Sequence, residues 1–391
     1  MACIPLADRA TGCYKRQVGS RWTVPEIATP ALVVDLEACA RNISAMASHA
    51  AANGIELRPH AKTHKCPAIA TRQLAAGATG ITVATLGEAE VFAEHGVGDV
   101  FVAYPLWAVG DIGQRLAQLS ERVRLSVGAD SVAAVEVLRR ELDRVTGRSP
   151  GQAARLAVRV EVDCGLRRSG VAPADAVHIA RAAADAGLVV DGIFTFPGHS
   201  YAPGMAATAR DDEARALCDG AASLEAGGIP CRVRSGGSTP TAAGTAGDAV
   251  NELRPGVYVF NDAQQLALGT CQPDAVALAA IATVVSAPAP GRIVLDAGAK
   301  VLGPERPPWA PGHGVLPDRP AARVTGLWEH HAVVDVTGTA ELDLAPLRLG
   351  AQVAVVPNHV CTAVNLARVL HVVAGGELVD RWEVAAAGAN R

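Results

Sequence analysis

Lysine is nearly missing from this 391-residue chain, in which it supplies four of the 35 lysines and arginines. Aromatic residues are also few, at 4%, and no apolar run reaches the ~20 residues that a transmembrane helix needs. The formal net charge of −4 gives no electrostatic reason to expect nucleic-acid binding. We therefore expect neither a membrane nor a nucleic acid as a partner. A chain that is 50% hydrophobic and rich in Ala, Gly and Val is typical of α/β proteins.

The nine cysteines are odd in number and scattered, so they do not have the pattern of a disulfide framework. The first residues, MACIPLADRATGCYKRQ, contain no apolar run long enough for a secretory signal. Both features favour the reducing cytoplasm as the location of the protein.

Short apolar runs alternate with segments of helical periodicity between residues 31 and 237. Apolar residues recur at helical spacing between most of these runs, as Ala40, Ile43 and Ala47 do ahead of a stop at Gly54. Eight such units predict a parallel (β/α)8 barrel of the TIM type. A doubly wound sheet is the alternative, but the chain has no GxGxxG turn to support it. The predicted strands are residues 31–36, 55–63, 80–86, 99–106, 123–129, 155–163, 192–198 and 231–237, the second of which leads into a loop.

Beyond about residue 265 the pattern changes to strand-like runs joined by Gly and Pro turns. One of them, VVAGGELV (372–379), is typical of a β-hairpin. We predict a barrel domain over residues 29–268 and a mostly-β domain over residues 269–391. The Pro-punctuated segment 1–28 fits no barrel unit and is assigned to the β domain.

Two of the four lysines lie in the stretch LRPHAKTHKC (57–66), next to two histidines. Catalytic groups of a parallel barrel lie at the C-terminal ends of its strands, and Lys62 follows the second predicted strand. A lysine that is desolvated there, beside His60, His64 and Lys65, has a lowered pKa, and its neutral amine can form a Schiff base. The alternative is a solvated basic loop that caps a helix or binds an anion.

The stretch RSGGSTPT (234–241) follows the last predicted strand of the barrel. Its small residues expose backbone N–H groups that, with the N-terminus of a following helix, can hold a phosphate. RPGVYVFND (254–262) supplies a further glycine and Tyr258 nearby, and an ordinary turn is the alternative. Together with a reactive lysine, these segments predict pyridoxal 5′-phosphate (PLP), held covalently at one end and by its phosphate at the other.

The stretch VDCGLRRSGV (162–171) ends another predicted strand. Its Arg168 can hydrogen-bond the phenolic oxygen of the cofactor or a substrate carboxylate. In a chain this rich in arginine, a surface role is the alternative.

The stretch PNHVCTAVN (357–365) follows a predicted strand of the β domain. If this segment is extended, His359 and Cys361 lie on one face. Imidazole and thiolate are good zinc ligands, and a catalytic zinc keeps positions open for substrate and water. A buried cysteine beside a structural histidine is the alternative.

Taken together, these segments resemble the D-threonine aldolase and D-serine dehydratase family, whose barrel is similar to that of alanine racemase. The resemblance runs from TPALVVDL to PNHVCTAVN through the motifs RPHAKTHK, DCGLRRSGV, GHSY, SGGSTPT, ELRPGVYVF, DAGAKVLG, EHH and PNHVC. It implies a PLP-binding barrel of fold type III and a β domain that carries a metal site. It also implies a homodimer in which each active site lies between the barrel of one subunit and the β domain of the other.

For single residues, the resemblance implies that Lys62 binds PLP covalently and that Arg168 lies near the phenolic oxygen. It implies a divalent metal on His359 and Cys361, with zinc preferred and manganese or magnesium open. The other cofactor-binding residues that it implies are His60, Tyr201, Ser235, Gly236, Gly237, Ser238, Thr239, Gly256, Val257 and Tyr258.

The chain departs from the family pattern near the pyridine ring, where relatives often place a tyrosine. This sequence has Phe196 there, with Tyr201 five residues later. The second metal ligand, Cys361, is the residue type of the dehydratases, whereas the aldolases tend to have a carboxylate. The cysteine favours dehydratase-like zinc binding and leaves the reaction open.

The resemblance implies lyase chemistry on β-hydroxy D-amino acids of the D-threonine and D-serine type. In dehydration, Lys62 removes the α-proton and the metal helps hydroxide leave, which gives a 2-oxo acid and ammonia. In retro-aldol cleavage, His199, or His359 through a metal-bound water, takes the hydroxyl proton, and the products are glycine and an aldehyde. The His–Cys pair disfavours two rivals, an amino-acid racemase and a non-catalytic PLP-binding protein, since neither needs a metal.

Overall fold

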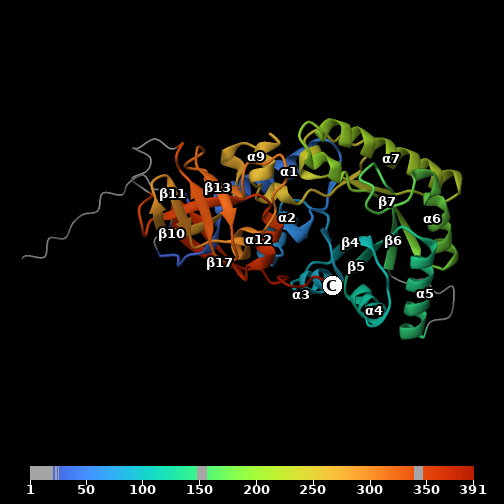
Figure 1. The fold of residues 1–391 in the computed structure, drawn as a ribbon. Helices are drawn as coiled ribbons and strands as arrows, with labels where there is room; N and C mark the ends of the chain where they lie inside the picture. The colour runs from blue at the N-terminus through green and yellow to red at the C-terminus, as the bar shows by residue number, and fades with distance from the viewer. Residues whose placement is uncertain (1–20, 23, 25, 148–155, 339–346) are drawn as a thin grey trace, which may run out of the picture.

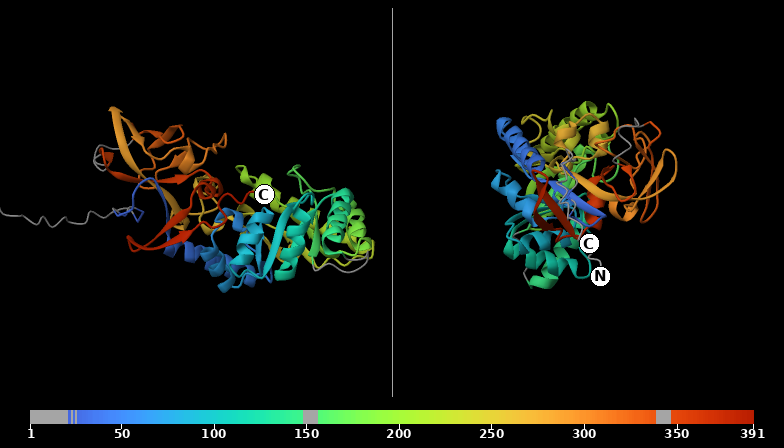
Figure 2. Two further views of the ribbon diagram at one scale, coloured as in Figure 1. Left: turned by 90° about the horizontal axis from the view of Figure 1, so that it is seen from below. Right: turned by 90° about the vertical axis from the view of Figure 1, so that its left-hand side faces the viewer.

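Two sheets organise the chain, and they lie at opposite ends of an elongated molecule (Figure 1, Figure 2). The computed structural model describes residues 21–22, 24, 26–147, 156–338 and 347–391. Within these residues one sheet has eight strands and the other has nine. No helix in this described part is long and apolar enough to cross a membrane.

The eight-stranded sheet is entirely parallel and closes into a barrel. Its edge strands meet where Thr82 bridges to His60 and donates its N–H to the carbonyl of Pro59 at 2.8 Å. This closure confirms the predicted barrel. The strands are β2 (Glu56–Leu57), β3 (Ile81–Val83), β4 (Asp99–Pro105), β5 (Arg124–Ala129), β6 (Leu156–Glu161), β7 (Val189–Phe194), β8 (Val233–Gly236) and β9 (Glu252–Leu253).

Helices cover the outside of the barrel, and their first turns carry recognisable caps. Thr85 and Ser131 accept backbone N–H groups at the starts of two of these helices, which satisfies donors that have no partner inside the helix. The helices are α2 (Pro67–Ala75), α3 (Leu86–Glu94), α4 (Ile112–Arg122), α5 (Val132–Thr146), α6 (Ala176–Asp185), α7 (Ala206–Ala226) and α8 (Thr239–Ala242). The short helix α9 (Ala263–Ala267) follows the barrel and packs against the second sheet through Ala263.

The predicted strand at residues 31–36 does not belong to the barrel. It forms β1 (Ala31–Asp35), which pairs with β10 (Leu278–Ala289) and β16 (Val369–Ala374) of the other sheet. All of β1 is buried, and a short apolar run has the same pattern in any sheet that is covered on both faces. The strand that completes the barrel is instead β9, whose two residues are too few to show a period. The predicted boundary at residues 268 and 269 stays a prediction.

The second sheet is mainly antiparallel and forms the mostly-β domain that the sequence predicts. The hairpin at VVAGGELV is confirmed, because Gly375 and Gly376 turn the chain with φ of 57° and 80°. The remaining elements of this part are α1 (Leu36–Ala52), β11 (Arg292–Leu295), α10 (Ala299–Leu302), β12 (Gly314–Val315), β13 (Arg323–Leu327), β14 (Ala332–Asp335), β15 (Gln352–Pro357), α12 (Val360–Leu366) and β17 (Glu377–Glu383).

The segment before residue 29 packs on this second sheet where it is described. Trp22, Val24 and Ile27 are buried in one cluster with residues of β1, β10 and β15. Residues 1–20, 23 and 25 lie outside the described residues.

Lys65 connects four parts of the chain near the barrel mouth. Its Nζ donates to Oδ1 of Asn365 at 2.6 Å and to Oδ1 of Asn390 at 2.8 Å, and it lies 3.1 Å from Oε1 of Glu88. The C-terminal segment therefore returns to α3 and the barrel (Figure 1). Lys65 is 5% exposed and has a left-handed φ of 49°, which an L-residue adopts only where its surroundings hold it.

Replacing Lys65 with methionine is expected to lower the free energy of unfolding by about 3–5 kcal/mol, because the buried Glu88 carboxylate loses its ion-pair partner. Denaturant titration measures the change. Lys300→Met is the matched control, since Lys300 pairs with Glu329 on the exposed surface and its loss is expected to change stability little. Equal shifts for the two variants would contradict the role of Lys65.

Candidate active site

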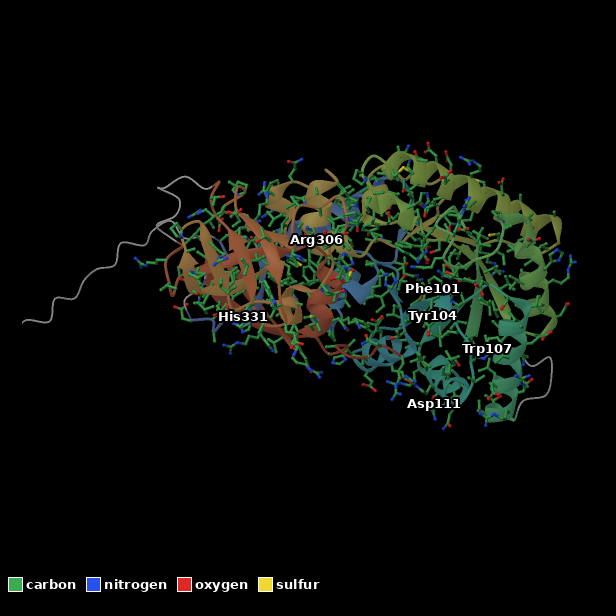
Figure 3. The ribbon with its side chains drawn as sticks, viewed as in Figure 1. Phe101, Tyr104, Trp107, Asp111, Arg306 and His331 are labelled. Carbon is green, nitrogen blue, oxygen red and sulfur yellow. The ribbon has the colours of Figure 1, made fainter. Side chains whose placement is uncertain are left out.

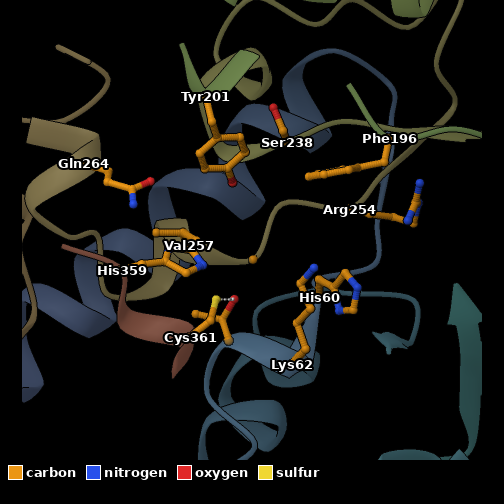
Figure 4. A pocket seen from close by; sticks show the side chains of 12 residues that line it. His60, Lys62, Phe196, Tyr201, Ser238, Arg254, Val257, Gln264, His359 and Cys361 are labelled. Carbon is orange, nitrogen blue, oxygen red and sulfur yellow. Dashed lines mark hydrogen bonds between the residues drawn. The ribbon is translucent and has the colours of Figure 1, made fainter. Parts of the chain in front are cut away.

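A cavity of about 280 Å³ opens at the C-terminal end of the barrel and faces α12 (Figure 4). Both parts of the chain contribute to it, since barrel loops form one wall and the start of α12 forms another. Its lining residues are His60, Lys62, Thr63, Phe196, Tyr201, Ser238, Arg254, Gly256, Val257, Gln264, His359 and Cys361.

Lys62 lies in the 3₁₀ turn η1 (Ala61–Thr63) just after β2, the first barrel strand. Burial lowers the pKa of Lys62, and the nearby cations Arg168 and Arg254 lower it further against the opposing influence of Cys361. Among the described residues no hydrogen bond or ion pair engages Nζ, which lies 5.5 Å from the ring centroid of Phe196. Burial and the two arginines therefore weaken the protonated form of Lys62 relative to a lysine in solvent, and the described part of the chain leaves its amine available.

His359 and Cys361 lie together in the same cavity, but for a different reason from the one predicted. The segment is not extended: β15 ends at Pro357, His359 is the N-cap of α12, and Cys361 is in its first turn. The sequence suggested an extended segment because VAVVP is strand-like, whereas the helix begins within the motif itself. Both side chains still reach the cavity from this helix start.

The two side chains are held as an acid–base pair. Burial raises the pKa of the Cys361 thiol, but the His359 imidazole and Lys62 outweigh it and lower that pKa below its usual value. Burial lowers the pKa of His359, yet the Cys361 thiolate and the Asp262 carboxylate raise it well above its usual value. In the described part of the chain no group of three or more His, Cys, Asp or Glu could hold a metal ion, so these two residues are the donor set to consider.

The loop after β8 reaches the cavity through Ser238, which also caps α8 by accepting the N–H of Thr241. Gly256 and Val257 approach from the segment after β9. A Cβ added to Gly256 would come within 2.6 Å of Oγ1 of Thr63, so a larger residue would close this approach. The backbone of Ser238, Gly256 and Val257 thus lies around one end of the cavity.

Other predicted phosphate-binding groups point elsewhere. Ser235 donates to Oε1 of Glu252 at 2.6 Å. Thr239 Oγ1 accepts the Tyr258 N–H at 3.0 Å, and the hydroxyl of Tyr258 accepts a hydrogen bond from Gln73 on α2. None of these side chains lines the cavity, and neither do Gly236 and Gly237.

Arg168 and His199 also lie outside the lining. The Arg168 guanidinium lies 5.3 Å from the ring centroid of Phe196, which itself lines the cavity. His199 Nε2 lies 3.4 Å from Oδ2 of Asp212 on α7, too poorly aligned for a hydrogen bond. Of the predicted residues, the cavity brings together His60, Lys62, Tyr201, Ser238, Gly256, Val257, His359 and Cys361.

Comparison with known proteins identifies the family. The family model described as alanine racemase, N-terminal domain matches residues 34–264, and a serine dehydratase domain matches residues 277–373. D-threo-3-hydroxyaspartate dehydratase from Delftia sp. (strain HT23) is 35% identical over 384 residues, covering 92% of this chain and 98% of the dehydratase. D-threonine aldolase from Arthrobacter sp. is 36% identical over 375 residues, 93% of either chain. The chain belongs to the D-threonine aldolase and D-serine dehydratase family.

A solved family member has the same fold. The structure of the Delftia dehydratase superposes with a TM-score of 0.83 at 34% identity, covering 92% of this chain and 97% of that one. Variants of that dehydratase with alanine in place of a histidine and, two positions later, a cysteine are also solved, and the cysteine variant is in a metal-free form. Membership confirms the predicted barrel with its β domain, the PLP-dependent family and the lyase class.

Three cavity residues of this family member were not singled out from the sequence: Thr63, Arg254 and Gln264. Arg254 opens the RPGVYVFND stretch and is buried. One terminal nitrogen donates to the carbonyl of Thr195, and Nε has no hydrogen-bond partner among the described residues. Burial lowers the pKa of Arg254 to about 10. The position of Arg254 in this motif could have identified it as a cavity residue. No sequence feature identifies Gln264, because its place in the cavity depends on how α9 meets α12.

Glu213 on α7 contacts the backbone of the glycine-containing loop that follows β8. The side chain is fully buried, and Oε1 accepts the N–H of Gly237 at 2.5 Å, while Oε2 has no hydrogen-bond partner within the described residues. Burial raises the pKa of this carboxyl to about 7, against the opposing influence of Gly237 and Arg254. The folded protein therefore resists ionisation of Glu213.

This raised pKa predicts a pH dependence of stability. The carboxyl ionises near pH 4.5 in the unfolded chain but near 7 in the folded one, so its contribution is intact below pH 4.5 and is lost as pH rises through 7. Glu213→Gln does not titrate, and its stability relative to wild type is expected to rise by about 3 kcal/mol across this window. Denaturant titrations at several pH values measure the difference, with exposed Glu225→Gln on the same helix as the control. Parallel profiles for wild type and Glu213→Gln would contradict the prediction.

Proposed function

We propose that this chain is a PLP- and divalent-metal-dependent lyase that acts on β-hydroxy D-amino acids. The observation that carries the proposal is the single cavity that contains both Lys62, with a lowered pKa, and the His359–Cys361 pair. The family relatives named dehydratase and aldolase support the same reaction class.

The residues of the cavity fit PLP. Lys62 would hold it covalently, Phe196 would face its ring, and the backbone at Ser238, Gly256 and Val257 would surround its phosphate. Two lining residues also carry buried polar atoms that find no partner in the described part of the chain, namely Nδ1 of His60 and Nε of Arg254. When bound, PLP withdraws electrons from Cα of an amino acid and so stabilises the negative charge that develops there.

The donor pair fits a soft divalent metal. An imidazole and a thiol with a lowered pKa suit zinc better than magnesium or manganese, which prefer oxygen ligands. His359 and Cys361 would hold the ion, and substrate or water would complete its coordination. A metal there would supply a Lewis acid for the β-hydroxyl.

Of the two lyase reactions, we propose dehydration to a 2-oxo acid and ammonia as the principal one. Lys62 Nζ lies inside the cavity and its lowered pKa suits a base, so it would be the group that takes the α-proton. Retro-aldol cleavage leaves the α-proton in place and needs a base at the β-hydroxyl instead. His199 faces Asp212 outside the lining, and His359 is committed to Cys361 and Asp262, which disfavours this second reaction.

The test is to incubate PLP- and zinc-loaded protein with D-threonine and to quantify both product pairs in one sample. 2-Oxobutyrate with ammonia supports the dehydratase. Glycine with acetaldehyde would replace dehydration by retro-aldol cleavage within the same class. Failure to form either pair from D-threonine, D-serine or D-threo-3-hydroxyaspartate would overturn the lyase proposal.

We also propose a homodimer. Tyr104 near the end of β4 and Trp107 just after it are labelled in Figure 3. They are 37% and 55% exposed, and Trp328 of the β domain is 59% exposed. Large exposed aromatic side chains are typical of protein interfaces. They lie on the two parts of the chain that the family pairs across its dimer, which supports the assembly.

A further inference from the structure

The Asp262 carboxylate joins the barrel side of the cavity to the start of α12. The side chain is 0% exposed. Its Oδ1 accepts the N–H of Gln265 at 3.0 Å and caps α9. Its Oδ2 accepts the N–H of Val360 at 3.2 Å and lies 3.2 Å from Nδ1 of His359.

This contact fixes Nδ1 of His359 as a nitrogen that carries a proton. A carboxylate can only accept hydrogen bonds, so the ring nitrogen that faces it, Nδ1, must be the donor. The other nitrogen, Nε2, then remains for Cys361 and for a ligand in the cavity that both side chains line. Metal-binding histidines commonly have their second nitrogen held by a carboxylate in this way.

We propose that Asp262 is a positioning residue for the metal, which selects the His359 tautomer with a free Nε2 and fixes the direction of the ring. The inference rests on the metal site of the proposed function and extends it to a residue that does not touch the ion. The backbone contact to Val360 adds to the effect, because the same oxygen orients both the ring and the helix start that carries Cys361.

The experiment measures zinc affinity by chelator competition in PLP-loaded wild type, Asp262→Asn and Asp262→Ala. Cobalt(II) absorption reports the coordination environment in parallel. Loss of a carboxylate behind a ligating histidine is expected to weaken zinc binding by about 10–100-fold, with PLP affinity unchanged. Asp35→Asn is the matched control, since Asp35 is another buried N-cap carboxylate, which accepts the N–H of Ala38 far from the cavity. Its zinc affinity is expected to stay at the wild-type value.

A second measurement does not depend on a variant that folds. In ¹⁵N-histidine-labelled wild-type protein loaded with zinc, NMR is expected to find the His359 proton on Nδ1. A proton on Nε2, or zinc affinity in a folded Asp262→Ala protein equal to wild type, would overturn the role of Asp262. If His359→Ala also retains wild-type zinc affinity, the metal site itself fails; if only the Asp262 variants do, the proposed function stands and this inference alone fails.

Discussion

Replacing Lys62 with alanine is expected to lower kcat/KM on the best D-amino acid by about 10³-fold or more and to remove the visible absorbance of bound cofactor. The reason is that the proposed function gives this side chain two tasks, covalent attachment of PLP and proton transfer at Cα, and a positioned base alone contributes about 10²–10⁴-fold. Stopped assays of 2-oxo acid together with absorbance spectra measure both effects.

Lys300→Ala is the control for Lys62, because this other lysine lies on the exposed surface beside Glu329 and outside the cavity. It is expected to keep wild-type turnover and absorbance. Lys62→Ala protein that still binds PLP covalently and turns over substrate would remove the basis of the proposed function.

Replacing His359 with alanine is the second large effect. The variant is expected to lose bound zinc and about 10³-fold in kcat, because a Lewis acid at a leaving hydroxide is worth several kcal/mol. Cofactor absorbance is expected to remain, since Lys62 and the loops around Ser238 and Gly256 are unchanged. Metal analysis, spectra and initial rates separate these outcomes.

His371→Ala tests whether loss of any histidine in the β domain has this effect. His371 lies in β16, outside the cavity, and its removal is expected to leave zinc content and kcat unchanged. A His359→Ala protein with full zinc content and wild-type kcat would contradict the metal assignment.

The barrel, and the positions of Lys62 and of the His359–Cys361 pair just after strands, could be predicted from the sequence because each leaves a local pattern. Alternating strands and helices give a period, and Lys62 and the His359–Cys361 pair stand at strand ends. Partners far along the chain leave no such pattern. Ser235 belongs to a predicted phosphate loop, yet its hydroxyl is taken by Glu252, which also pairs with Arg58 and Arg159 inside the barrel.

The assignment of β1 failed for the same reason. Its five buried residues would fit a strand in any sheet that is covered on both faces. Only the pairing with β10 and β16, more than two hundred residues later, determines which sheet β1 joins. Asp262 shows a further limit. The sequence presents it as a polar residue after an apolar run, whereas its importance comes from the approach of His359 from the β domain.

The structure gives a separate reason for each of the two lysines in LRPHAKTHKC. Lys62 faces the cavity without a hydrogen-bond or ion-pair partner among the described residues, whereas Lys65, three positions later, is buried with Glu88, Asn365 and Asn390. One lysine is available for chemistry and the other holds the surrounding segments together. The two cannot exchange roles, because Nζ of Lys65 is already fully engaged.

The most direct test of this account is to load the protein with PLP, reduce it with borohydride, and locate the added mass by peptide sequencing in a mass spectrometer. Reduction makes the covalent bond between cofactor and lysine permanent. The account predicts the label on Lys62 alone. A label on Lys65 or Lys300, or no label after loading, would contradict it.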